Sequence, residues 1–146
     1  MTRILLLNGP NLGRLGQRQP QVYGHTTLAE VVARATEHAH RRDATLEHLQ
    51  SNHEGSLIDR IEQLDYDGVV INPGALGHTS YALRDALEGA ERPAIEVHIS
   101  DVHRREPFRH VLLLESVVIG QVIGRGVDGY LEAIDILLDH LARAER

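Results

Sequence analysis

The sequence predicts an α/β protein with a flavodoxin-like open parallel sheet of five strands, in the order 2-1-3-4-5, with helices on both faces. Three observations lead to this prediction. Short apolar runs alternate with amphipathic stretches of helical period from end to end. Two runs, Ile4 to Leu7 and Val69 to Ile71, are apolar at every position, as expected of central parallel strands covered on two sides. The length of 146 residues suits one domain with one sizeable core, which we expect to cover residues 1–146.

The first expected strand, Arg3 to Asn8, leads into a long segment that ends at Gly24. This segment is rich in Gly and Pro, and we expect it to contain no helix. A helix is expected next, because Thr27 and Glu30 have the spacing of a capping box, and it runs to about Arg42.

The middle of the chain repeats this alternation. We expect the second strand over Thr45 to Ser51 and the third over Gly68 to Asn72. Between them the apolar residues have helical spacing, which predicts a second helix. The residues expected on its buried face are Leu57, Ile58, Ile61 and Leu64.

The C-terminal half continues with a third helix from about Ser80 to Gly89 and a fourth strand over Ala94 to Ser100. The fifth strand is expected over Val117 to Gly124. The last helix has the clearest period of 3.6 residues. Its apolar stripe consists of Val127, Tyr130, Leu131, Ile134, Leu137, Leu138 and Leu141.

Polar residues gather where the central strands end. In open parallel sheets the ligand binds beyond the carboxyl ends of the strands, where the strand order reverses. The first strand ends at Asn8 and leads to Asn11, and the third ends at Asn72 and leads to His78. In the fourth strand a period of two places Glu96, His98 and Ser100 on one face.

The loop after the first strand contains one tyrosine, Tyr23, behind two arginines, Arg14 and Arg18. Tyrosine is a poor base at neutral pH, but nearby guanidinium groups favour the phenolate. We therefore expect Tyr23 as a base and His98 as an acid, with Asn11 or Asn72 donating to a developing oxyanion. Two structural alternatives remain open: Tyr23 packs under its loop, and His98 is a hydrogen-bonded core residue.

Three arginines, Arg104, Arg105 and Arg109, follow the fourth strand. In a chain with a formal net charge of −6 this local cluster suggests a small anionic substrate. The alternative is that they are solvated surface charges.

Composition excludes several function classes. The negative net charge argues against a general nucleic-acid-binding protein, and no apolar run approaches the ~20 residues of a membrane span. The chain has no cysteine, which excludes disulfides and thiolate chemistry and fits a cytoplasmic protein. It also shows no signal peptide pattern. All 15 basic residues are arginine, so neither an imine-forming lysine nor the usual phosphate loop is present.

No metal or other cofactor is expected. The residues His38 and His40 are two apart on a helix and face different sides, and no H-E-x-x-H pattern occurs. The segment from Gly120 to Gly126 is glycine-rich, but its spacing and its place at the last strand do not fit a dinucleotide-binding fingerprint.

Several motifs resemble the type II 3-dehydroquinate dehydratases, and they follow one another over nearly the whole chain. The first is Asn8-Gly9-Pro10-Asn11-Leu12 with Arg18, Pro20, Tyr23 and Gly24. The others are Ser51 to Gly55, Asn72-Pro73-Gly74 with His78-Thr79-Ser80 and Arg84-Asp85-Ala86, Glu96 to Ser100, Arg105 with Phe108-Arg109-His110, and Gly129-Tyr130.

The resemblance implies a metal-free anti elimination that converts 3-dehydroquinate to 3-dehydroshikimate through an enolate. It implies that Tyr23 removes the proton alpha to the ketone, with Arg18 holding it as phenolate. Asn11 helps to stabilise the enolate through a water, and His98, oriented by Glu96, protonates the departing hydroxyl. The pathway implied is shikimate and aromatic amino acid biosynthesis, with quinate breakdown as the alternative.

The resemblance also implies the residues that bind the substrate and the assembly. Asn72, His78, Arg109 and the backbone amides of Ile99 and Ser100 would hold the carboxylate and hydroxyls. Asp85 aligns with a residue that reaches a neighbouring subunit's site, which implies a homo-oligomer, a dodecamer built as a tetramer of trimers.

The chain departs from the family pattern at a few positions. Gln19 replaces an acidic residue, Asp101 an Asn, and Gly77 a bulkier residue. The segment from Val111 to Ser116 replaces a stretch that contains Ser-Tyr-x-Ser. It follows Arg109, so this departure affects the lid packing and the subunit contacts that the resemblance would otherwise imply. The alternative from another class is a non-enzymatic flavodoxin-like module that binds a phosphate or nucleotide on the first loop.

Overall fold

The five strands form one parallel sheet, and the expected strand order is confirmed. The structure, a computed structural model, describes residues 1–145; Arg146, the last residue of the expected domain, lies outside them. Neighbouring strands follow the order β2-β1-β3-β4-β5, and every pair is parallel. The strands are β1 (Thr2–Asn8), β2 (Ala44–Gln50), β3 (Gly68–Asn72), β4 (Ala94–His98) and β5 (Gly120–Ile123).

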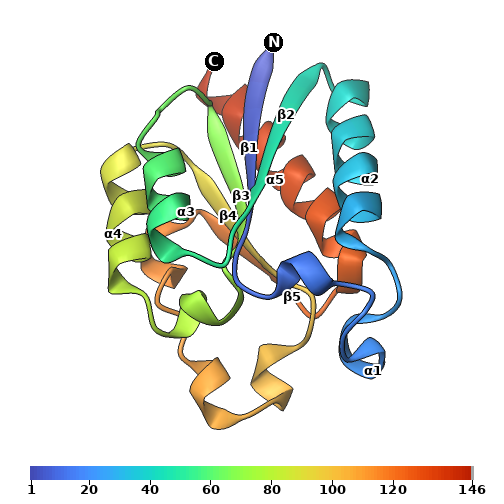
Figure 1. Ribbon diagram of the computed structural model, residues 1–146. Helices are drawn as coiled ribbons and strands as arrows, with labels where there is room; N and C mark the ends of the chain where they lie inside the picture. Colours follow the sequence, from blue (N-terminus) through green and yellow to red (C-terminus); the bar gives the residue numbers. More distant parts are fainter. Residues whose placement is uncertain (146) are drawn as a thin grey trace.

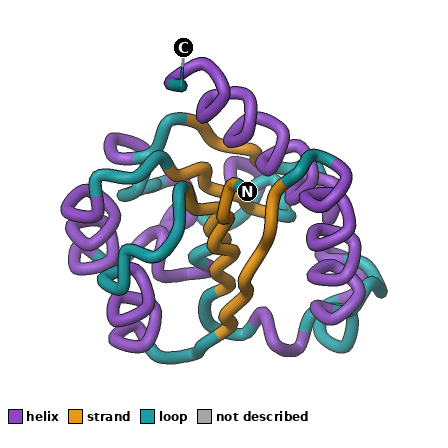
Figure 2. The backbone as a smooth tube through the Cα atoms, turned by 90° about the horizontal axis from the view of Figure 1, so that it is seen from above, coloured by secondary structure: helices purple, strands orange, loops and turns teal. Residues whose placement is uncertain are grey.

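Helices cover both faces of the sheet (Figures 1 and 2). The helices α2 (Leu28–Arg41) and α5 (Gly129–Ala144) cover one face, and α3 (Glu54–Ile61) with α4 (Tyr81–Ala90) covers the other. The apolar run from Ile4 to Leu7 in β1 explains this arrangement, because Ile4 and Leu6 pack with α2 and α5 while Leu5 and Leu7 pack with α3 and α4.

Side chains cap the starts of the helices α2 and α4. The expected capping residue Thr27 accepts a hydrogen bond from the Glu30 amide at 3.2 Å, which begins α2. Ser80 accepts one from the Leu83 amide at 2.9 Å and begins α4, close to the expected boundary.

Several expectations about the elements and their boundaries were wrong. Pro20–Tyr23 forms the short helix α1, because proline is well tolerated in the first turn of a helix. Helix α3 ends at Ile61, so Leu64 lies beyond it with φ 56° and is exposed rather than on the buried face. Val117 closes a 3₁₀ turn (Glu115–Val117), and β5 begins only at Gly120.

The carboxyl ends of the strands meet at the bottom of the molecule in Figure 1. Around them lie α1 and several 3₁₀ turns, of which Gly74–His78 follows β3 and Val102–Arg104 and Pro107–His110 follow β4. Strand β4 ends at His98, so Ser100 lies just past the strand. These short segments, rather than the long helices, surround the candidate site.

Candidate functional site

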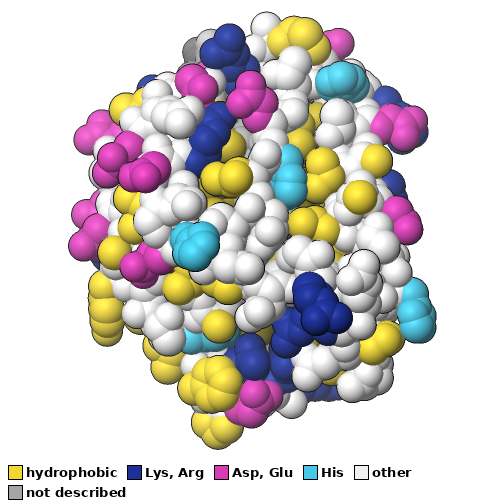
Figure 3. Space-filling model, in the orientation of Figure 1, with side chains coloured by type: hydrophobic (Ala, Val, Ile, Leu, Met, Phe, Trp, Pro, Cys, Tyr) yellow, Lys and Arg dark blue, Asp and Glu magenta, His cyan; other side chains and the backbone are white. Residues whose placement is uncertain are grey.

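A pocket opens at the carboxyl ends of β1, β3 and β4, where the strand order reverses. Arginine side chains gather at this end of the molecule (dark blue, lower part of Figure 3). The structure brings together most of the side chains that the sequence suggested. The predicted residues that line the pocket are Asn11, Arg18, Tyr23, Asn72, His78, His98, Ile99, Ser100 and Arg109.

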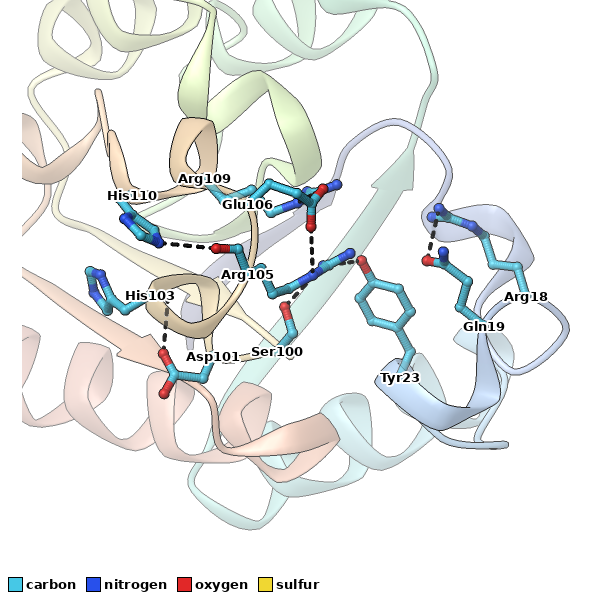
Figure 4. A network of polar contacts seen from close by, with 10 residues as sticks. All are labelled: Arg18, Gln19, Tyr23, Ser100, Asp101, His103, Arg105, Glu106, Arg109 and His110. Atoms are coloured by element: carbon cyan, nitrogen blue, oxygen red, sulfur yellow. Dashed lines mark hydrogen bonds and ion pairs between the residues drawn. The ribbon is translucent and has the colours of Figure 1, made fainter.

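The hydroxyl of Tyr23 receives a hydrogen bond from a guanidinium group. Arg105 Nη1 donates to it at 2.6 Å (Figure 4). The Cζ atoms of Arg105 and Arg18 lie 5.4 and 5.5 Å from the centre of the Tyr23 ring. A guanidinium that donates to a phenol oxygen stabilises the phenolate relative to the neutral phenol. The pair is therefore suited to a tyrosine that accepts a proton.

The two arginines come from different segments, contrary to the expectation that the first loop supplies both. Arg14 is exposed and does not line the pocket. Arg18 Nη2 donates to Gln19 Oε1 at 3.3 Å, and Arg18 lies beside the ring rather than on the hydroxyl. The contact with the hydroxyl is made by Arg105, which follows β4.

Arg105 is held by its neighbours. Its Nη1 also donates to Ser100 Oγ at 3.2 Å, and its Nε lies 3.8 Å from a carboxylate oxygen of Glu106. Its carbonyl accepts from His110 Nε2 at 3.1 Å (Figure 4). The Arg105 side chain is 16% exposed, so it is positioned and largely screened from solvent before any ligand arrives.

A histidine and a buried glutamate form the second part of the site. His98 Nε2 donates to Glu96 Oε2 at 2.6 Å, and the Glu96 side chain is fully buried. The other carboxylate oxygen accepts from Gln121 Nε2 at 2.8 Å. Because Nε2 is used in this way, Nδ1 is the nitrogen of His98 that remains for a ligand. The prediction that Glu96 and His98 lie together on one face is confirmed.

His78 packs against His98, with ring centres 5.8 Å apart and nearly parallel planes. Burial is the main cause that lowers the pKa of His78, so the ring is neutral at pH 7. Its Nδ1 donates to the Val111 carbonyl at 2.7 Å, which leaves Nε2 as an acceptor.

The divergent segment from Val111 to Ser116 contacts the site through its backbone. Besides the Val111 carbonyl, the Leu113 amide donates to the Gly77 carbonyl at 2.9 Å. Both contacts use main-chain atoms, so they do not depend on the side chains that replace the family's polar stretch. Gly77 itself is tightly surrounded, because a Cβ there would lie 2.8 Å from Pro73 Cγ.

The two asparagines differ in how they are held. Asn72 is buried; its Oδ1 accepts from the Gly74 amide at 3.1 Å and its Nδ2 donates to the Tyr130 hydroxyl at 2.9 Å. Asn11 has a left-handed backbone with φ 70°, which asparagine tolerates better than most residues. Its side chain lines the pocket from the first loop.

Asp85 is the predicted site residue that lies away from this pocket. It is on α4, its side chain is 72% exposed, and it pairs with Arg84 at 2.8 Å. Arg109 does line the pocket and donates to Glu106 Oε2 at 3.1 Å.

Three functional contacts were missed at the sequence level. Arg105 was noted as one of three arginines after the fourth strand and as part of a motif with Phe108-Arg109-His110, but neither observation assigned it to the hydroxyl of Tyr23. Tyr130 was quoted in the motif Gly129-Tyr130 and in the apolar stripe of the last helix, but its hydrogen bond to Asn72 was not expected. Gln121 gave no signal, because it is a polar residue within an expected strand.

Within residues 1–145, no three His, Asp or Glu side chains lie close enough together to hold a metal ion. The helices in this part of the chain are too short or too polar to cross a membrane.

Comparisons with known proteins agree with this geometry. Residues 2–138 match the family described as Dehydroquinase class II. A 3-dehydroquinate dehydratase of Anoxybacillus flavithermus is 55% identical over 141 residues, which cover 95% of each chain. A catabolic 3-dehydroquinase of Aspergillus oryzae is 50% identical over 146 residues, 98% of this chain and 95% of that one. The crystal structure of a type II dehydroquinase from Butyrivibrio crossotus matches with a TM-score of 0.92 and 45% identity, over 94% of this chain and 97% of that chain.

Proposed function

Since the chain belongs to the class II dehydroquinase family and is an enzyme that dehydrates 3-dehydroquinate, we propose that it does so by anti elimination through an enolate, without metal or cofactor. The product is 3-dehydroshikimate. Family membership also sets aside the alternative of a non-enzymatic nucleotide-binding module. The observation that carries the mechanism is the hydrogen bond from Arg105 to the Tyr23 hydroxyl.

Tyr23 is the base in this mechanism. As a phenolate it takes the proton from the carbon next to the ketone, and the electron pair of the broken C–H bond moves to the ketone oxygen as an enolate. Arg105 and Arg18 stabilise the phenolate by their positive charge. Asn11, near the start of the first loop, lines the same pocket and donates to the enolate oxygen through a water.

His98 is the acid in the second step. The enolate re-forms the ketone, a new C=C bond forms, and the C–O bond to the leaving hydroxyl breaks. The proton on His98 moves to that hydroxyl, which departs as water. Glu96 supports this role, because its buried carboxylate pairs with Nε2 and stabilises the imidazolium form.

The substrate is bound by the residues around this pair. Asn72, His78, Arg109 and the backbone amides of Ile99 and Ser100 line the same pocket and offer donors and acceptors for a carboxylate and several hydroxyls. Arg109 supplies positive charge for the carboxylate.

We assign Asp85 to a neighbouring subunit's site in a dodecamer made of four trimers. Its exposed position on α4, away from the pocket of its own chain, supports this assignment. Analytical ultracentrifugation of the purified protein tests the assembly: a monomer at micromolar concentration would contradict it.

The proposed place of the reaction is the shikimate pathway to aromatic amino acids, in the cytoplasm. Relatives include enzymes named 3-dehydroquinate dehydratase and others named catabolic 3-dehydroquinase, and the same reaction serves both. Deletion of the gene decides between them. A requirement for aromatic amino acids supports biosynthesis, and loss of growth on quinate alone supports catabolism.

The decisive assay follows the rise in ultraviolet absorbance of the enone product. We expect turnover that chelators and borohydride leave unchanged, since neither a metal nor an imine takes part. Tyr23→Phe removes the base and should abolish nearly all turnover with an unchanged melting temperature. Tyr81→Phe is the control, because Tyr81 is 69% exposed and does not line the pocket. Substantial turnover by Tyr23→Phe would mean that another group is the base.

A further inference from the structure

A network of hydrogen bonds runs behind the pocket, and the proposed mechanism uses only one of its residues, Asn72. The hydroxyl of Tyr130, on α5, lies between two asparagines at the paired ends of β1 and β3. It donates to Asn8 Oδ1 at 2.5 Å and accepts from Asn72 Nδ2 at 2.9 Å. Asn8 Nδ2 in turn lies 3.0 Å from His48 Nε2 on β2. This network of hydrogen bonds therefore links the pocket to three strands and one helix.

The Gly74 amide can only donate to Asn72 Oδ1, and this gives the network of hydrogen bonds its direction. Burial lowers the pKa of His48, which favours the neutral ring, and Nε2 of that ring accepts because Asn8 Nδ2 can only donate. Asn8 then presents its oxygen to Tyr130, whose pKa burial raises, so that the hydroxyl keeps its proton and donates it to Asn8. The oxygen of Tyr130 is thereby left as an acceptor for an N–H of Asn72.

The direction matters because it settles which way the amide of Asn72 faces. With Nδ2 bonded to Tyr130, Oδ1 is turned to the Gly74 amide. Nδ2 carries two protons, and Tyr130 takes only one of them. The second N–H is thus available at the pocket that Asn72 lines.

We propose that Tyr130 is a positioning residue for substrate binding: it holds the amide of Asn72 so that an N–H donor is already in place for an oxygen of the substrate. This rests on the proposed role of Asn72 in binding 3-dehydroquinate. A phenylalanine would fill the same space, but it would leave Asn8 Oδ1 and Asn72 Nδ2 without their buried partner and release the amide.

The test compares two variants that each remove one buried hydroxyl. Tyr130→Phe should raise the KM for 3-dehydroquinate about tenfold, the effect of one hydrogen bond, and change kcat by less than about threefold. Tyr66→Phe is the matched control, because Tyr66 is also buried and its hydroxyl donates at 2.6 Å to the Ile61 carbonyl, away from the pocket. It should lower the melting temperature similarly and leave KM unchanged.

Two outcomes would overturn the inference. If Tyr130→Phe lowers the melting temperature as Tyr66→Phe does but leaves KM unchanged, the hydroxyl is purely structural and the inference is wrong. If Tyr130→Phe does not fold, Asn8→Ala replaces it. That variant frees the Tyr130 hydroxyl to donate to Asn72 and should raise KM, and an unchanged KM overturns the inference.

Asn72→Ala separates this inference from the proposed function. An unchanged KM in Asn72→Ala refutes the binding role of Asn72 itself. A raised KM in Asn72→Ala with an unchanged KM in Tyr130→Phe refutes only the role of Tyr130. In the double variant we expect no further rise beyond Asn72→Ala alone, because Tyr130 acts through that residue.

Discussion

Replacing Arg105 by methionine tests the electrostatic part of the mechanism most directly. The substitution keeps the length of the aliphatic stem and removes the guanidinium that donates to Tyr23 at 2.6 Å. A hydrogen bond that involves a charged group contributes about 1.5–3 kcal/mol. If all of it is lost from the transition state for proton removal, kcat/KM falls roughly 10- to 150-fold.

The dependence of the rate on pH gives a second measurement. Arg105→Met removes the positive charge that stabilises the proposed phenolate base, so we expect its loss of activity to be smaller in alkaline buffer than at neutral pH. The steady-state absorbance assay, repeated from pH 6 to about 10 in buffers that bracket the free tyrosine range, measures both effects.

Arg104→Met is the control, because it removes the same charge from the adjacent residue. The Arg104 side chain is 87% exposed and forms an ion pair with Asp101 at 3.5 Å. We expect kcat/KM within about twofold of the wild type, because exposed ion pairs contribute little. The reasoning is refuted if Arg105→Met loses less than threefold, or if Arg104→Met loses as much as Arg105→Met.

The remaining predictions concern stability and are measured by urea unfolding. Gly9→Ala places a Cβ 2.3 Å from the Pro73 carbonyl oxygen and should cost about 1–3 kcal/mol, whereas Gly55→Ala, with open space around its Cβ, should not destabilise. Leu114→Ala should cost about 2–5 kcal/mol, because Leu114 is fully buried in the divergent segment; a loss below 1 kcal/mol would show that this segment packs loosely. Burial lowers the pKa of His48 in the folded protein. As the pH is lowered below about 6.5, the unfolded chain therefore binds more protons than the folded one, and the free energy of unfolding decreases. His48→Gln keeps an acceptor and should lose less stability than the wild type between pH 7 and 5; an equal loss would contradict this.

The patterns that identified the fold are local, which explains why they succeeded. An unbroken apolar run such as Ile4 to Leu7 is incompatible with a strand exposed on one side, and it lies in the centre of the sheet as predicted. The capping box at Thr27 was likewise readable because its two groups are three residues apart. Local patterns failed where an apolar residue serves another purpose, as Val117 does in a turn over the α3–α4 layer.

The sequence by itself determined the α/β alternation and a short set of polar side chains that follow the central strands, because both depend on residues close together along the chain. Only the tertiary structure decided how these side chains are paired. Arg105 meets Tyr23 across 82 residues, and Tyr130 meets Asn72 across 58. Periodicity predicts which face of its own helix or strand a residue occupies. It does not predict which residues of other elements lie opposite that face. Which arginine reaches the phenol, and which apolar-looking tyrosine orients an amide, is therefore set by how the helices and turns pack against the sheet.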